Sequence, residues 1–145
     1  MFKHILVPTD GSALSMTAVQ NAMTLARDAH AKVTVITIME PFHIFSLNSE
    51  QLADTRSAYE KHVGEAAERC LEGAKRQAEA LGVQCEAVHV EHALPYKAII
   101  DTAAAKGCDL IAMASHGRRG AAALLLGSET VKVLTHSSIP VLVYR

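Results

Sequence analysis

The sequence has few cysteines, no excess of charge of either sign and no long apolar run, and each lack excludes a class of protein. Cys70, Cys85 and Cys108 are the only three cysteines and show no CxxC spacing, which favours free thiols in a reducing compartment over a disulfide framework. Fourteen Lys and Arg stand against 15 Asp and Glu, a net charge of −1, so nothing indicates a nucleic-acid partner. No segment approaches the roughly 18 consecutive apolar residues of a membrane span, and residues 1–8 resemble neither a signal nor a transit peptide.

What the sequence does contain is the composition of an ordinary globular domain. Half of its residues are hydrophobic and 20% are charged. A chain of 145 residues has the size of one domain, and such a domain buries about 70% of the surface of its unfolded chain. We therefore expect a single soluble domain over residues 1–145, located in the cytoplasm.

Short β-branched runs alternate with helical stretches along the chain. The five predicted strands cover residues 5–7, 33–38, 83–90, 110–113 and 141–143. The first, second and fourth are apolar at nearly every position, which is typical of strands buried on both faces. The third carries Gln84, Glu86 and His89, which indicates a more exposed edge strand.

Apolar stripes at helical spacing predict four helices between these strands. They cover residues 14–29, 59–81, a stretch that begins at Pro95, and about 128–136. Gly82 and Gly107 fall where helix C-caps are expected. Strands that alternate with helices are joined by parallel crossovers, so the sequence predicts an α/β fold with helices on both faces of a parallel sheet.

The stretch from Glu40 to Glu50 is the one irregular segment. It contains Phe42 and Phe45 and is interpreted either as a loop that packs under the long helix or as a lid or partner-facing patch. Cys70 lies on the inner stripe of that helix, where we expect core packing rather than redox sensing.

Ligands of open parallel sheets bind beyond the carboxyl ends of the strands, so the loops at those ends are the candidate sites. Residues 8–12 follow the first strand. Their Asp10 either caps the following helix or accepts hydrogen bonds from the hydroxyls or amines of a ligand.

Residues 114–128 form the second candidate loop, between the fourth strand and the last helix. Its glycines allow close approach to an anion or a positive φ, Gly127 and Ser128 stand at a helix N-terminus, and Arg118 and Arg119 carry charge suited to phosphate. The alternative is a flexible glycine-rich turn with a serine N-cap and solvated arginines.

These residues resemble the universal stress protein family over essentially the whole chain. Residues 5–12, Ile-Leu-Val-Pro-Thr-Asp-Gly-Ser, resemble its first strand and loop, and residues 140–143 resemble its last strand. The family's nucleotide signature is Gly-x-x-Gly, nine residues, then Gly-Ser or Gly-Thr. Gly117, the nine residues that follow it, and Gly127-Ser128 match three of its fixed elements, whereas the first glycine position holds Ala114.

The resemblance implies a Rossmann-like or flavodoxin-like sheet of five parallel strands in the order 3-2-1-4-5, with ATP, ADP or AMP bound where the two loops converge. It implies that Mg²⁺ accompanies the nucleotide through its phosphates, and that the protein dimerises through the last strand, at Val141, Leu142, Val143 and Tyr144. An uncovered apolar edge strand favours such pairing on physical grounds as well. The family and the chemistry of the loops together predict these nucleotide-binding residues: Pro8, Thr9, Asp10, Ile38, Ala114, His116, Gly117, Arg118, Arg119, Gly127, Ser128 and Glu129.

Missing motifs argue against other classes. The first turn lacks the Gly-x-Gly-x-x-Gly of a dinucleotide dehydrogenase, and no Walker-type loop is present. A receiver domain needs clustered acids, but Asp10 stands alone. A hydrolase needs a nucleophile–base pair, and we expect that the adjacent Ser115 and His116 cannot easily face each other.

We therefore expect a dimeric, ATP-binding stress-response protein that acts as a nucleotide-dependent sensor or regulator. A nucleotide-free dimeric interaction module of the same fold is the main alternative, and Ala114 is the feature in its favour. A slow ATP hydrolase is the third reading: His116 would be its base, although a histidine between Ser and Gly more often packs or caps.

Overall fold

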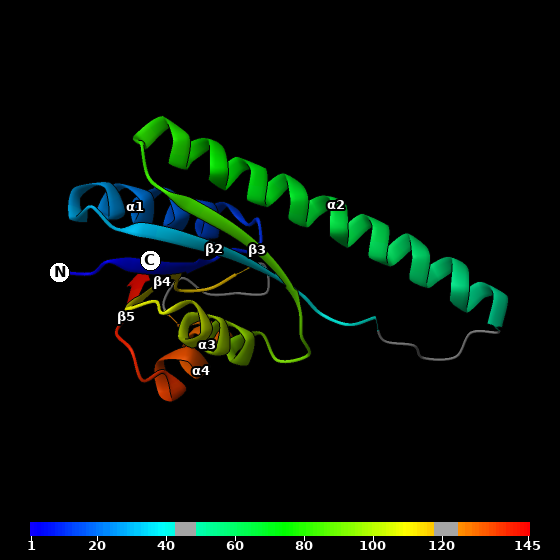
Figure 1. Ribbon diagram of the computed structural model, residues 1–145. Helices are drawn as coiled ribbons and strands as arrows, with labels where there is room; N and C mark the ends of the chain where they lie inside the picture. Colours follow the sequence, from blue (N-terminus) through cyan, green and yellow to red (C-terminus); the bar gives the residue numbers. More distant parts are fainter. Residues whose placement is uncertain (43–48, 118–124) are drawn as a thin grey trace.

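The computed structural model describes residues 1–42, 49–117 and 125–145, which alternate between strands and helices along the chain (Figure 1). The elements are β1 (His4–Pro8), α1 (Ala13–Ala29), β2 (Lys32–Met39), α2 (Ser49–Leu81), β3 (Cys85–Glu91), α3 (Pro95–Lys106), β4 (Leu110–Ala114), α4 (Ser128–His136) and β5 (Val141–Tyr144). The predicted strands and the starts of α3 and α4 are confirmed, with boundaries that move by one or two residues.

The described strands form one sheet in the order β3-β2-β1-β4-β5, and every neighbouring pair is parallel. This confirms the predicted α/β fold and strand order. The order reverses at β1, which pairs with β2 on one side and with β4 on the other. The loops after β1 and β4 therefore meet at the carboxyl edge of the sheet, where parallel sheets bind ligands.

Helices α1 and α2 cover one face of the sheet, and α3 and α4 cover the other (Figure 1). Successive residues of a strand point to opposite faces, so Ile5 and Val7 join the cluster under α1 and α2, while Leu6 joins the cluster under α3 and α4. All three side chains are fully buried. Two buried faces explain why the central strands are apolar at consecutive positions.

Local chemistry accounts for most helix ends. Gly107 ends α3 and Gly82 follows α2, both with positive φ (69° and 67°), as predicted for C-caps. The C-cap of α1 is His30, a non-glycine residue at φ 55°, which no signal in the sequence indicated. Ser12, rather than Asp10, caps the start of α1: its side chain accepts a hydrogen bond from the Ser15 N–H at 3.3 Å.

Helix α2 begins at Ser49, well before the predicted start at Tyr59, so the end of the predicted irregular segment is helical. Figure 1 shows that α2 extends past the edge of the sheet. Residues 54–58 of this extension are exposed, and an exposed helix surface carries no apolar stripe that could reveal it in the sequence. Phe42 packs its ring 5.3 Å from that of Tyr59, while Phe45 lies outside the described residues.

The three cysteines are free thiols. Burial, together with the nearby Asp109 charge, raises the pKa of Cys108 to about 11, and burial raises the pKa of Cys85. Both are therefore protonated, unreactive thiols at neutral pH. Cys70 Sγ lies 3.7 Å from Met16 Sδ, the packing role expected for it.

A membrane-crossing helix would have to be both long and apolar, and the described parts of the chain contain no such helix.

Candidate ligand-binding cleft

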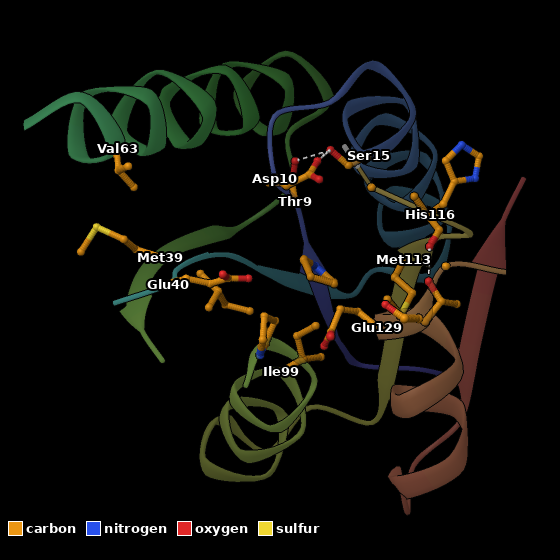
Figure 2. Close-up of a pocket in the computed structure, with 18 of the residues that line it drawn as sticks. Thr9, Asp10, Ser15, Met39, Glu40, Val63, Ile99, Met113, His116 and Glu129 are labelled. Carbon is orange, nitrogen blue, oxygen red and sulfur yellow. Dashed lines mark hydrogen bonds between the residues drawn. The ribbon is translucent and has the colours of Figure 1, made fainter. Parts of the chain in front are cut away.

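A cleft of about 430 Å³ opens at the carboxyl edge of the sheet, between the loops after β1 and β4 (Figure 2). Its volume lies within the range of about 300–1,000 Å³ that is usual for small-molecule sites. Every predicted nucleotide-binding residue that the structure describes lines this cleft: Pro8, Thr9, Asp10, Ile38, Ala114, His116, Gly117, Gly127, Ser128 and Glu129. Arg118 and Arg119 lie outside the described residues.

Asp10 is exposed to the cleft and supports the loop that carries it. Its Oδ1 accepts hydrogen bonds from the Ser12 N–H and the Ser15 hydroxyl, each at 2.9 Å, and Figure 2 shows the bond to Ser15. Asp10 therefore shapes the turn before α1 while its carboxylate stays at the cleft surface. Of the two roles considered for Asp10, the cap of α1 is supplied by Ser12 instead, and the ligand-facing role stays a prediction.

Thr9 holds the same loop from beneath. Its side chain is buried; its hydroxyl lies 2.9 Å from Ser15 Oγ and accepts the Gly11 N–H at 3.2 Å. Because these partners are within the protein, Thr9 contributes to the shape of the wall more than to direct hydrogen bonding with a ligand. Ser15, which bonds both Thr9 and Asp10, was not predicted and lines the cleft too.

Gly117 is required by close packing. A Cβ built on it would overlap Oδ2 of Asp10 and lie 3.3 Å from Cγ. Its φ is not positive: within the described residues, Gly11, Gly82 and Gly107 are the glycines with positive φ. Of the two reasons considered for glycine in this loop, close approach applies to Gly117 and a left-handed backbone does not.

Gly127 also sits against a neighbouring backbone. Its N–H donates to the Ser115 carbonyl at 2.7 Å, and a Cβ on it would lie 3.1 Å from His116 Cα. Gly127 is the N-cap of α4 with φ −62° and no side-chain cap, and Ser128 is the first helical residue. The alternative of a serine N-cap is therefore wrong. The first N–H groups of α4 have no acceptor within the helix, and they lie at the end of α4 that borders the cleft.

Ala114 ends β4, where it pairs with Tyr144 of β5. It is 6% exposed, and its φ is negative, since His30 is the one non-glycine residue with positive φ among those described. Its carbonyl accepts the Thr130 hydroxyl at 3.1 Å. The backbone at this position has no conformational need for glycine, so the methyl group replaces the motif glycine without strain.

Ser115 and His116 do face each other, contrary to the expectation from their adjacency. Ser115 Oγ lies 3.1 Å from His116 Nδ1, because the chain leaves the strand at this point and turns. Ser115 is buried behind the cleft, and Figure 2 shows the imidazole of His116 directed away from the other labelled side chains. The pair is arranged as a structural contact rather than as a nucleophile aimed into the cleft.

The far wall of the cleft comes from residues that the sequence argument did not single out as site residues. Met39 is the last residue of β2 and Glu40 follows it, while Tyr59 and Val63 project from α2. The Tyr59 hydroxyl donates to the Glu40 carbonyl at 2.9 Å and so ties α2 to the end of β2. Tyr59 and Val63 begin the apolar stripe of the long helix. That stripe predicted the helix but did not indicate that these residues line a cleft.

The near wall joins α3 to α4. Glu129 Oε2 accepts the Tyr96 N–H at 2.8 Å, and Glu129 Oε1 lies 3.2 Å from Lys132 Nζ. Lys132 also sits 5.6 Å from the centre of the Tyr96 ring. Glu129 was predicted as a nucleotide-binding residue, but nothing in the sequence indicated these side-chain contacts.

The described lining is acidic. It contains three carboxylates, Asp10, Glu40 and Glu129, together with His116, and its described part contains no Lys or Arg. Over residues 1–42, 49–117 and 125–145, no three His, Cys, Asp or Glu side chains are grouped as a metal ion requires.

Comparison with protein families and curated proteins gives consistent matches. A model of the universal stress protein family matches residues 1–145. Universal stress protein MJ0531 of Methanocaldococcus jannaschii is 32% identical over 147 residues, covering all of this chain and 83% of that protein. Universal stress protein YxiE of Bacillus subtilis is 31% identical over 153 residues, covering all of both chains.

Solved structures match over the same extent. The structure of MJ0577 of Methanocaldococcus jannaschii matches with a TM-score of 0.81 at 26% identity, covering 99% of this chain and 95% of that one. A universal stress protein crystallised in complex with cAMP matches with a TM-score of 0.74 at 29% identity, covering 99% and 97%.

Proposed function

Since the chain belongs to the universal stress protein family, we propose that its cleft binds an adenine nucleotide and that the protein acts as a nucleotide-dependent sensor or regulator in the stress response. The observation that carries this proposal is the composition of the cleft. One end has apolar side chains, including Ile38 and Val63, and the other has a turn and the N-terminus of α4. A base and a phosphate need these two environments.

The arrangement of the lining residues supports one orientation for the nucleotide. The base would lie against Ile38, Met39 and Val63, near the backbone at the end of β2. The ribose would lie near Asp10, whose carboxylate can accept hydrogen bonds from hydroxyl groups. The phosphates would lie at Gly127 and the first N–H groups of α4, with Ser128 adding a hydroxyl donor. The predicted contribution of Arg118 and Arg119 falls outside the described residues.

Two further observations support this assignment. A related protein at 29% identity was crystallised with cAMP, an adenine nucleotide. In this chain, Gly117 and Gly127 both pack against the loops that form the cleft, so the signature residues maintain its shape. Mg²⁺ would bind through the phosphates. The alternative of a nucleotide-free module rested on Ala114, and the unstrained backbone there weakens its support.

We propose in addition that the protein is a homodimer formed through β5 (Val141–Tyr144). This strand pairs with β4 on one side and is the edge of the described sheet on the other, and Leu142 is 37% exposed. Pairing with a second copy would cover an apolar edge. The free thiols of all three cysteines agree with a reducing, cytoplasmic location.

The test is nucleotide binding by the wild type and by Gly127→Val, measured by equilibrium dialysis with labelled ATP and Mg²⁺. We expect micromolar binding by the wild type, about −8 kcal/mol, and none by the variant, because the valine side chain would push away the His116 backbone and fill the phosphate end. Far-ultraviolet circular dichroism should be the same for both proteins. Equal binding by the two proteins would contradict the assignment of this end to phosphate.

A further inference from the structure

The carboxylate of Glu129 accepts a hydrogen bond at the N-terminus of the neighbouring helix α3. Glu129 is the second residue of α4, and its Oε2 accepts the N–H of Tyr96, the second residue of α3. The N-cap of α3, Leu94, makes no side-chain cap, and Pro95 has no N–H to offer. Glu129 therefore serves as the missing capping acceptor of α3, reaching across from α4 (Figure 2).

This carboxylate is fixed in place by a second contact. Its Oε1 lies 3.2 Å from Lys132 Nζ one turn further along α4, and 37% of the Glu129 side chain remains exposed. The ammonium group of Lys132 also lies over the Tyr96 ring. Glu129 thus has a defined orientation and still borders the cleft, so its carboxylate has a fixed position beside the N-terminus of α4.

A phosphate chain at α4 would meet this charge directly. The N–H groups that would receive a phosphate belong to the same first turn as Glu129. Lys132 pairs with Glu129 Oε1 from one turn further along but does not line the cleft, and the described lining contains no Lys or Arg. Coulomb repulsion grows with the charge of the ligand. Glu129 therefore repels a triphosphate more strongly than a monophosphate, unless a divalent cation neutralises the phosphate groups.

We propose that Glu129 is a specificity-determining residue that selects by phosphate-chain length: the cleft favours a nucleoside monophosphate over the metal-free triphosphate. This inference rests on the proposed function, since it assumes that a nucleotide binds with its phosphates at α4. Glu129 acts by charge, and its hydrogen bond to Tyr96 sets where that charge stands.

The experiment compares AMP and ATP in the wild type, Glu129→Gln and Asp101→Asn by titration calorimetry in EDTA. Glutamine keeps an oxygen that can accept the Tyr96 N–H, so α3 remains capped. Asp101, on α3, is exposed and paired with Lys97 at 3.2 Å, and it lies outside the cleft. Its variant changes the net charge equally and serves as the matched control. Thermal unfolding of each protein verifies that it is folded.

We expect the ratio Kd(ATP)/Kd(AMP) in EDTA to exceed one in the wild type, to fall about tenfold in Glu129→Gln, and to stay constant in Asp101→Asn. Excess Mg²⁺ should reduce the difference between the wild type and Glu129→Gln. An equal ratio in these two proteins, with both nucleotides bound, would overturn the role of Glu129 and leave the proposed function standing. Absence of binding of either nucleotide to the wild type, with and without Mg²⁺, would overturn both.

Discussion

Gly117 packs directly against the carboxylate of Asp10, so that these two residues from separate strand-end loops close the same corner of the cleft. A Cβ on Gly117 would overlap Oδ2 of Asp10, while Oδ1 is held by Ser12 and Ser15. The carboxylate therefore cannot move aside without losing its bonds. The glycine after β4 and the aspartate after β1 act as one structural unit.

Gly117→Ala tests this unit. The added methyl group should displace the Asp10 carboxylate and weaken adenine-nucleotide binding by about tenfold or more, as expected when a positioned charged hydrogen-bond acceptor is lost. Calorimetric titration with ATP and Mg²⁺ measures the effect. The matched control is Gly64→Ala on α2, where a Cβ meets nothing within 4 Å.

The control should bind nucleotide as the wild type does and should be more stable by up to about 1 kcal/mol, since alanine favours a helix over glycine. If Gly117→Ala binds as tightly as Gly64→Ala, Asp10 either tolerates the displacement or does not contact the ligand. Equal binding would contradict the claim that Gly117 and Asp10 act as one unit in nucleotide binding.

The β5 edge gives a prediction on assembly. Leu142→Asp should convert a dimer into a monomer of 15.5 kDa, because a carboxylate at an exposed edge strand opposes pairing with another strand. Sedimentation equilibrium measures the mass. The control is Leu94→Asp, at a somewhat more exposed leucine (44%, against 37% for Leu142) outside β5. This variant should remain dimeric. A monomeric wild type at micromolar concentration would contradict the dimer.

A buried histidine at the start of the central strand β1 predicts a loss of stability in mild acid. His4 is buried, with Nε2 2.8 Å from Thr34 Oγ1. Burial and the Lys32 charge lower its pKa, and the carboxylates of Asp109 and Glu86 oppose this only in part. The unfolded chain therefore binds a proton more readily than the folded protein, and the free energy of unfolding falls as the pH drops below about 6.5.

His4→Gln removes this titration and keeps a group that can bond Thr34. Urea unfolding between about pH 7.5 and pH 5.5 should show a smaller loss of stability in the variant than in the wild type. The remaining histidines are common to both proteins, so they cancel in the comparison. Parallel pH profiles for the two proteins would show that His4 does not titrate differently on folding.

The sequence contained enough information to predict the sheet. Runs such as residues 33–38 are apolar at nearly every position because both faces of β2 are covered, and that pattern is a local property of the chain. Pro95, Gly82 and Gly107 mark helix ends through their own backbone preferences. The start of α2 was missed because its exposed residues 54–58 are helical without an apolar stripe.

The residues that line the cleft were largely predictable from the sequence, and the contacts among them were not. The loops after β1 and β4 were located correctly, since strand ends of a parallel sheet converge by topology. The bond between Ser115 and His116, the position of Gly117 against Asp10, and the capping of Tyr96 by Glu129 depend on how the chain turns and on residues far apart in the sequence. Spacing in one sequence carries no signal for such contacts.

The central claim is that the cleft between the loops after β1 and β4 binds an adenine nucleotide. Its most direct test is a calorimetric titration of the full-length protein, freed of bound small molecules by denaturation and refolding, with ATP and Mg²⁺. The account predicts saturable heat with about one nucleotide per chain and a micromolar Kd, which is lost in Gly127→Val. A refolded wild type with native circular dichroism that releases no heat with ATP or AMP would contradict it.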